Sequence, residues 1–132
     1  MNAENADRGQ PDRAAEGMNL EALLAIAGGD LGLLRELLGT FLAEIPVLIR
    51  AVGEAIDRRN GEALVEAAHK LKGVVRYLHM DRAFEQVQRL ELFGRQAGNW
   101  REAEAVFQDL RLSIDGAIRA LDDLMRKPPP PG

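Results

Sequence analysis

The segment GEALVEAAHKLKGVVRYLHM, from Gly61 to Met80, decides the fold predicted for this chain. Advancing by about 100° per residue, as in an α-helix, gathers its apolar side chains on one side and its charged side chains on the other. We therefore expect an amphipathic helix over residues 62–79 that packs against other helices. The side facing the core would hold Leu64, Ala67, Leu71, Val74, Val75 and Leu78.

The opposite face of this helix is centred on His69. A histidine on that face is either an ordinary surface residue or a nucleophile, because a neutral imidazole can attack and hold a covalent intermediate. Gly73 destabilises the interior of this helix by roughly 1 kcal/mol relative to alanine. Its lack of a side chain would leave room beside His69 for another molecule. Lys72 and Arg76 would attract anions and stabilise an attached phosphoryl group. The residues around His69 are Glu62, Glu66, Lys72, Gly73 and Arg76.

Four further helical patterns flank this segment, over residues 20–27, 31–56, 81–97 and 100–124. Leucine and alanine, with 19 copies each, far outnumber valine, isoleucine and threonine, which favours helix over strand. Asp30 is a predicted N-cap, and Asn99 with Glu102 resembles a capping box. Pro46 lies inside the second pattern and should bend that helix, but the apolar stripe continues in phase beyond it.

The predicted fold is all-α: an antiparallel up-down four-helix bundle with a short N-terminal helix that covers one end. Four long helices joined by short turns bury their stripes most simply in this way. We expect residues 1–17 to form a disordered N-terminal arm and residues 18–126 to form the bundle. Residues 127–132 would form a Pro-rich tail, because consecutive prolines favour an extended polyproline form.

Composition excludes several classes of function. The chain has no cysteine, so disulfides, cysteine nucleophiles and cysteine-based zinc sites are excluded. A net charge of −4 argues against a general nucleic-acid binder. The first ten residues lack the apolar core of a secretory signal, and no run of about 18 apolar residues is present to span a membrane. We therefore expect a cytoplasmic protein, and a monomer.

Several motifs together resemble the histidine-containing phosphotransfer (Hpt) domain family. AHKLKG at Ala68–Gly73 is similar to the family signature A-H-x-L-K-G-S. Upstream, GGDLGLLRELLGTFLAEIP at Gly28–Pro46 includes a stretch similar to the family's G-G-D-x-x-L-L segment, and Leu90-Glu91 and Gly98-Asn99-Trp100 resemble later landmarks. The resemblance covers about residues 18–125. Val74 departs from it, where serine is common, and so does His79, where glycine is usual.

The resemblance implies a phosphoryl carrier rather than an enzyme. Hpt domains carry a phosphoryl group on one histidine between receiver-domain aspartates of response regulators, or accept it on the way from a hybrid sensor histidine kinase. His69 matches the phospho-accepting position, and Lys72 and Gly73 match the supporting residues. The chain has no phosphate-binding loop and no Asp-rich metal loop. We therefore expect it to hold no cofactor and the partner receiver domain to supply Mg²⁺.

We expect the partner to bind beside His69, at Val65, Glu66 and Arg76. Val65 lies about 40° from His69 on the helical wheel, which predicts an exposed apolar contact rather than a core residue. Lys72 and Arg76 should speed encounter with an acidic phosphorylation pocket.

Three alternatives use the same residues. The departures at Val74 and His79 leave open a non-catalytic Hpt-like module that docks on, or inhibits, a receiver domain or kinase. Glu66 and His69 form one E-x-x-H motif, but a di-iron bundle needs two such motifs that face inward. A zinc site at His69 and His79 lacks an evident third ligand. We therefore predict no metal site.

Overall fold

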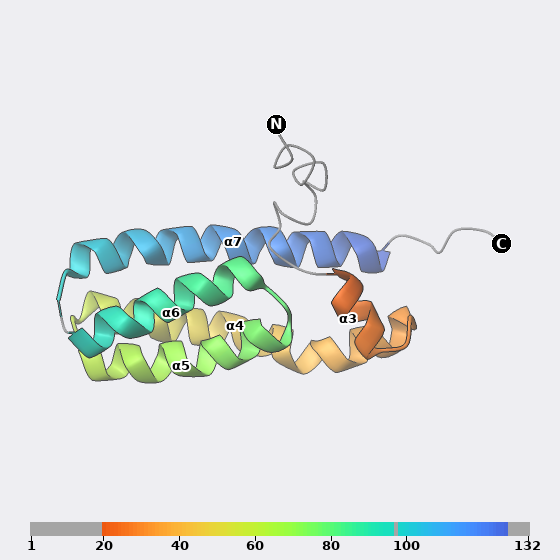
Figure 1. Ribbon diagram of the computed structural model, residues 1–132, viewed down its shortest axis with the longest axis horizontal. Helices are drawn as coiled ribbons and strands as arrows, with labels where there is room; N and C mark the ends of the chain where they lie inside the picture. The colour runs from red at the N-terminus through yellow and green to blue at the C-terminus, as the bar shows by residue number, and fades with distance from the viewer. Residues whose placement is uncertain (1–19, 97, 127–132) are drawn as a thin grey trace, which may run out of the picture.

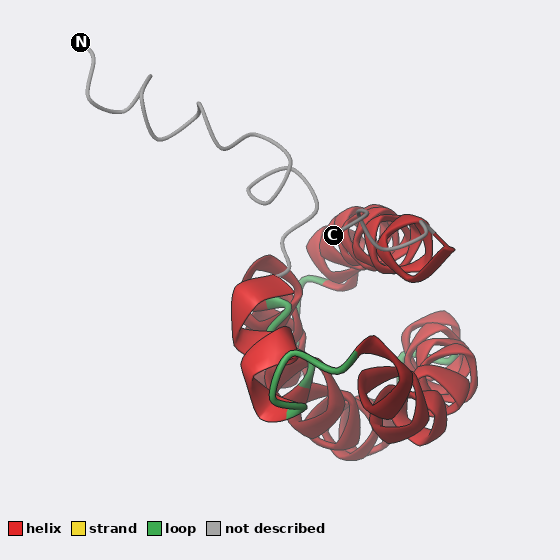
Figure 2. Ribbon diagram, turned by 90° about the vertical axis from the view of Figure 1, so that its right-hand side faces the viewer, coloured by secondary structure: helices red, strands yellow, loops and turns green. Residues whose placement is uncertain are grey.

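The computed structural model describes residues 20–96 and 98–126 of the chain, which form helices joined by short turns. This confirms the predicted fold class, since the described residues contain no strand (Figures 1 and 2). The expected arm over 1–17, the tail over 127–132 and the last residue of the helical pattern expected over 81–97 lie outside the described residues. The helices are α3 (Leu20–Ile26), α4 (Leu31–Asp57), α5 (Gly61–Tyr77), α6 (Asp81–Gln96) and α7 (Trp100–Arg126).

The four long helices run alongside one another in alternating directions (Figure 1). Each contacts the next along the chain, and α7 also contacts α4, so the four surround a shared core (Figure 2). The short α3 packs against α4. Each long helix contributes fully buried aliphatic side chains to the core, among them Leu34, Leu38, Ile56, Leu64, Leu71, Leu90, Leu110 and Ile114.

Side-chain caps start three of these helices, α4, α5 and α7, and at α7 the predicted cap Asn99 accepts a hydrogen bond from the backbone N–H of Glu102 at 3.2 Å. The Asp30 carboxylate accepts a hydrogen bond from the backbone N–H of Leu33 at 3.1 Å, which confirms the predicted N-cap of α4. The Asn60 side chain accepts one from the backbone N–H of Ala63 at 3.0 Å, so Asn60 caps α5 and Gly61 is its first residue. Pro46 lies within α4, which continues as one helix past it.

The sequence predicted α5 to reach His79, but the helix ends two residues earlier. His79 has a positive φ of 57°, in the left-handed region that favours glycine. Its backbone N–H donates to the Arg76 carbonyl at 3.1 Å, and the N–H of Met80 donates to the Val75 carbonyl at 2.9 Å. This Schellman pattern closes the helix and turns the chain into α6.

Helices α5 and α6 share the most extensive helix contact in the described structure. The two helices approach each other closely at Gly94 on α6, where an added Cβ would lie 2.9 Å from the Gly61 carbonyl oxygen and 2.9 Å from Val65 Cγ2. A glycine is therefore required there. This close packing brings side chains of α6 against the His69 face of α5.

Candidate functional site

His69 lies on the solvent side of α5, as the helical wheel predicted. Its side chain is 69% exposed. Its neighbour Ala68, which the wheel did not assign to the core, is fully buried. The apolar side chains assigned to the core are all buried: Leu64, Ala67, Leu71, Val74, Val75 and Leu78.

A buried carboxylate from α6 faces this imidazole. Oε2 of Glu91 lies 3.5 Å from Nδ1 of His69, and the Glu91 side chain is only 7% exposed. Lys72 Nζ donates to Oε1 of Glu91 at 2.7 Å, and an Arg95 guanidinium nitrogen donates to Oε2 at 2.8 Å. These four residues are called the Glu91 cluster below. A buried anion is thereby held between two cations, with one oxygen directed at the exposed imidazole.

The Glu91 cluster keeps its carboxylate ionised. The hydrogen bond from the Lys72 ammonium is the main reason why the pKa of Glu91 lies below its ordinary value of 4.5. Arg95 lowers this pKa as well, whereas burial of the carboxylate raises it, and the lowering dominates. An ionised carboxylate accepts hydrogen bonds and cannot donate them. It therefore favours the neutral His69 tautomer with the proton on Nδ1, which leaves the lone pair on Nε2.

Three of the predicted site residues differ in their solvent exposure and in their contacts within the chain. Gly73 is exposed, and a Cβ added there would meet nothing within 4 Å, so no packing within the chain requires a glycine. Arg76 is exposed and its guanidinium lies 5.7 Å from the centre of the Phe84 ring. Lys72 is only 24% exposed and is paired with Glu91. The positive charge of Lys72 is thus largely compensated within the bundle by the Glu91 carboxylate.

The two remaining predicted contacts lie on the first turns of α5. Glu66 is exposed, and its carboxylate lies 3.8 Å from Lys70 Nζ. The expectation that Val65 is exposed was wrong: it is half-buried, because α6 approaches so closely at Gly94 that Val65 Cγ2 packs against it. A wheel for one helix does not include this neighbour.

Glu91 and Arg95 are the site residues that sequence reasoning missed. Leu90-Glu91 was noted only as a family landmark, without a role. The available signal was position: Glu91 follows the buried Leu90 directly and lies four residues after the buried Val87, so it falls within the inward stripe of α6. A buried charge needs a partner of opposite charge, and Arg95 lies one turn further along the same helix.

The expectation that Glu66 and His69 point outward is confirmed, since both side chains are mostly exposed. Within residues 20–96 and 98–126, no group of three histidine, cysteine or acidic residues is arranged to hold a metal ion. None of the helices described here has the length and apolar character needed to cross a membrane.

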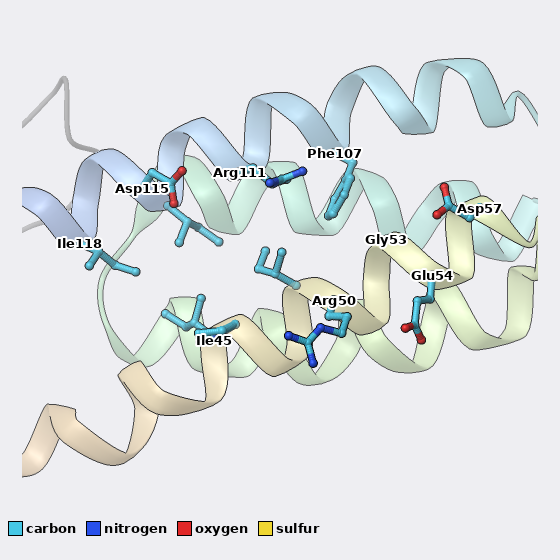
Figure 3. A pocket seen from close by; sticks show the side chains of 12 residues that line it. Ile45, Arg50, Gly53, Glu54, Asp57, Phe107, Arg111, Asp115 and Ile118 are labelled. Atoms are coloured by element: carbon cyan, nitrogen blue, oxygen red, sulfur yellow. The ribbon is translucent and has the colours of Figure 1, made fainter.

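A hollow away from His69 lies between α4 and α7 (Figure 3). It is a groove of about 510 Å³ in which Phe107 packs against Gly53. Arg50 and Arg111 lie along it together with Glu54, and no residue of α5 or α6 lines it. The groove is therefore separate from the His69 face and offers neither a histidine nor a buried carboxylate.

One family model matches the chain, that of the Hpt domain, over residues 36–124. This range is more than half of the 132 residues and includes all of α5 and α6, and with them the whole Glu91 cluster. No curated protein and no solved structure matches the chain.

Proposed function

Because the chain belongs to the Hpt domain family, we propose that it carries a phosphoryl group on Nε2 of His69 between the aspartates of receiver domains. Hpt domains are phosphocarrier modules of two-component signalling, they interact with receiver domains, and they are generally not enzymes. We take the four long helices as an up-down bundle whose N-terminal helix covers one end. The single observation that carries the proposal is the exposed imidazole with a buried carboxylate at its Nδ1.

The proposed step is a displacement at phosphorus. The Nε2 lone pair of His69 attacks the aspartyl phosphate of a receiver domain, an N–P bond forms, and the bond from phosphorus to the aspartate oxygen breaks. The aspartate leaves as a carboxylate with the electron pair. No proton has to leave Nε2, because the Glu91 carboxylate favours the tautomer with the proton on Nδ1.

Glu91 has a second role after the transfer. With its proton still on Nδ1, the phosphorylated ring carries a positive charge, which the adjacent carboxylate stabilises. The same proton makes the return step easier, because the ring then leaves as neutral imidazole when phosphorus moves to the next aspartate. Lys72, behind the carboxylate, holds Glu91 in place and acts as a positioning residue.

The surroundings of His69 suit an incoming phosphoryl group. The Arg95 side chain is 60% exposed and shares Oε2 of Glu91 with His69, so its remaining N–H donors are accessible beside the imidazole. Gly73 leaves the surface one turn beyond His69 bare. Phosphoryl transfer depends mainly on positioning and on charge stabilisation, and the partner receiver domain would supply Mg²⁺.

The test is phosphorylation by receiver domains charged with acetyl phosphate in the presence of Mg²⁺. The parent chain should acquire a label that is lost in acid and retained in base, as phosphohistidine is. His69→Gln should abolish this label. His79→Asn is the matched control, because it removes the only other imidazole and asparagine tolerates a positive φ.

The alternative of a non-catalytic docking module predicts a different result. A receiver domain would then bind the chain, but the parent would take up no acid-labile label. Label retained in His69→Gln and lost in His79→Asn would instead assign the carrier role to His79.

A further inference from the structure

The groove between α4 and α7 has a natural reference point where Gly53 meets Phe107. A Cβ added to Gly53 would lie 3.1 Å from Phe107 Cζ, and both residues line two adjoining hollows of about 510 and 520 Å³. The two helices run in opposite directions (Figure 1). Residues that precede Gly53 on α4 therefore lie on the same side of this point as residues that follow Phe107 on α7. This point is called the Phe107 level below.

The charges on the two sides of the Phe107 level are opposite in sign. Arg50 and Arg111 lie three and four residues from it on one side, about 4.5 to 6 Å along the helices. Asp57 and Glu104 lie four and three residues from it on the other side. Figure 3 shows Arg111 and Asp57 on opposite sides of Phe107. The groove thus has a basic half and an acidic half.

Helix α7 carries this alternation further. Its charged residues about the groove follow in the order Arg101, Glu104, Arg111 and Asp115, with Phe107 in the middle. Each of these charges has a charge of opposite sign at a similar distance on the other side of Phe107. All four charged side chains are exposed, as are those of the two charged residues on α4.

These charges are largely unpaired within the chain. Among the described residues, the only ion pair that the six make is that of Glu104 with Arg59 at 3.1 Å, and both of its side chains are about half exposed, at 48% and 51%. Arg50 and Glu54 have the four-residue spacing of a helical ion pair, but Glu54 also lines the hollow between α4 and α5. The groove therefore offers charges of both signs to another molecule.

We propose that a second copy of this chain docks on the groove, related to the first by a two-fold axis that crosses the groove at the Phe107 level. Around this axis α4 faces α4 and α7 faces α7, each pair antiparallel. Arg50 then meets Asp57 of the second copy, Arg111 meets Glu104 of the second copy, and symmetry repeats each contact. An axis parallel to the helices would instead bring Arg50 to Arg111 of the second copy, and repulsion excludes it.

The outer charges of α7 fit the same arrangement, because Asp115 meets Arg101 of the second copy. A partner that matches the groove must carry the same alternating order of charges at the same spacing. A second copy carries that order by symmetry, whereas an unrelated protein would need it independently. Charge complementarity therefore favours a second copy as the occupant.

The size of the contact makes this dimer weak and reversible. Helix α4 ends four residues after Gly53 and α7 begins seven residues before Phe107, so the symmetric overlap is roughly 20 Å long. Two helices, each about 10 Å wide, then bury roughly 400 Å² per copy, about half of what a stable interface buries. The sequence led us to expect a monomer, and the proposed dimer departs from that expectation at high protein concentration and low salt.

The test is sedimentation velocity of the full chain over a wide range of concentrations, at low and at high salt. The mean mass of the parent should rise with concentration at low salt, and high salt should suppress the rise. Arg50→Asp and Asp57→Arg should each weaken self-association at least about tenfold, which corresponds to about 1.4 kcal/mol. An equimolar mixture of these two variants should associate as the parent does, because both contacts in the mixed dimer join opposite charges.

Arg119→Asp and Asp109→Arg are the matched controls, since they make the same changes of charge at exposed positions of α7 that do not line the groove. Both should associate as the parent does. A parent that stays monomeric at every concentration in low salt would overturn the proposal and leave the groove to a different partner. So would a mixture that fails to recover, or controls that weaken association as much as the groove variants. The groove shares no residue with the Glu91 cluster, so each of these results is independent of the proposed function.

Discussion

Glu91 on α6 presents its Oε2 to Nδ1 of His69 on α5 at 3.5 Å. The contact joins an almost fully buried anion to a largely exposed ring, so the imidazole is oriented from beneath while Nε2 remains accessible. Lys72 and Arg95 hold the anion at 2.7 Å and 2.8 Å. The orientation of His69 therefore depends on the packing of α5 against α6 as much as on α5 itself.

Replacing Glu91 should separate hydrogen bonding from charge. Glu91→Gln keeps an oxygen that can accept from Nδ1–H but removes the negative charge, whereas Glu91→Ala removes both. Both variants weaken the contact that positions Nδ1 of His69, so transfer to Glu91→Ala should be roughly 10-fold slower than to the parent, a barrier change of about 1.4 kcal/mol. The rate of transfer to Glu91→Gln should lie between the rates for the parent and for Glu91→Ala. Stopped-flow or rapid-quench transfer kinetics measure this order, and equal rates for all three proteins would refute the orienting role.

The lowered pKa of Glu91 predicts a pH dependence of stability. Because the folded-state pKa lies below the ordinary 4.5, the unfolded chain binds the proton more readily. The stabilisation is complete above pH 4.5 and decreases as the pH falls through the folded-state pKa. Urea unfolding at several pH values should show a smaller loss of stability on acidification for Glu91→Gln than for the parent. Identical pH profiles would show that the ion pairs contribute nothing to folding.

Sequence periodicity predicted most of the fold because each helix carries its own pattern of apolar residues and caps. The exposure of His69 and the burial of Leu71 and Val75 follow from such a pattern alone. The role of Glu91 does not, because it arises from two helices whose spacing is set by a glycine at position 94. For the same reason Val65 was expected to be exposed and is half-buried.

Two glycines near the site should respond to alanine in opposite ways. At Gly73 a Cβ enters open space, so Gly73→Ala should stabilise the helix by about 1 kcal/mol. At Gly94 a Cβ would lie 2.9 Å from the Gly61 carbonyl oxygen and 3.1 Å from the Val65 nitrogen, both backbone atoms. Gly94→Ala should therefore destabilise by about 1–3 kcal/mol. Denaturant unfolding measures the free energy of unfolding of both variants. A stabilising effect of Gly94→Ala would contradict the described approach of α5 and α6.

A bulky side chain at Gly73 should also reduce transfer, although it stabilises the chain. Gly73→Leu would fill the bare surface beside His69 and obstruct the approach of a receiver domain. The reduction should persist at all ionic strengths, because it is steric. Labelling by phosphoramidate, a much smaller donor, should be affected far less.

The left-handed residue after α5 offers a stabilising substitution. His79 has a φ of 57°, a conformation that disfavours residues with a Cβ by roughly 1–2 kcal/mol. His79→Gly removes that penalty, and part of the gain is offset by the greater freedom of glycine in the unfolded chain. The free energy of unfolding should therefore rise by up to about 1 kcal/mol, with transfer to His69 unchanged. A decrease would mean that packing of the half-buried imidazole outweighs the backbone strain.

Arg76 and Lys72 should affect transfer through different mechanisms. Arg76 is exposed and makes a contact only with the Phe84 ring among the interactions described for it, so its charge extends into solvent. Arg76→Glu should slow transfer strongly at low salt, and the defect should shrink as salt rises, because the screening length falls from about 30 Å at 0.01 M to about 3 Å at 1 M. Lys72→Ala should instead cause a defect that salt changes little, because it loosens Glu91 within the bundle.

Arg119→Glu is the matched control for charge reversal, since Arg119 is an exposed arginine on α7 that makes the same change in net charge far from α5 in the sequence. Its transfer rate should stay close to that of the parent at every ionic strength. If Arg119→Glu and Arg76→Glu slow transfer equally, only the net charge of the chain matters and the receiver domain is not steered toward the His69 face. If Lys72→Ala shows the salt dependence predicted for Arg76→Glu, the ammonium acts on the partner directly, and the assignment of Lys72 as a positioning residue is wrong.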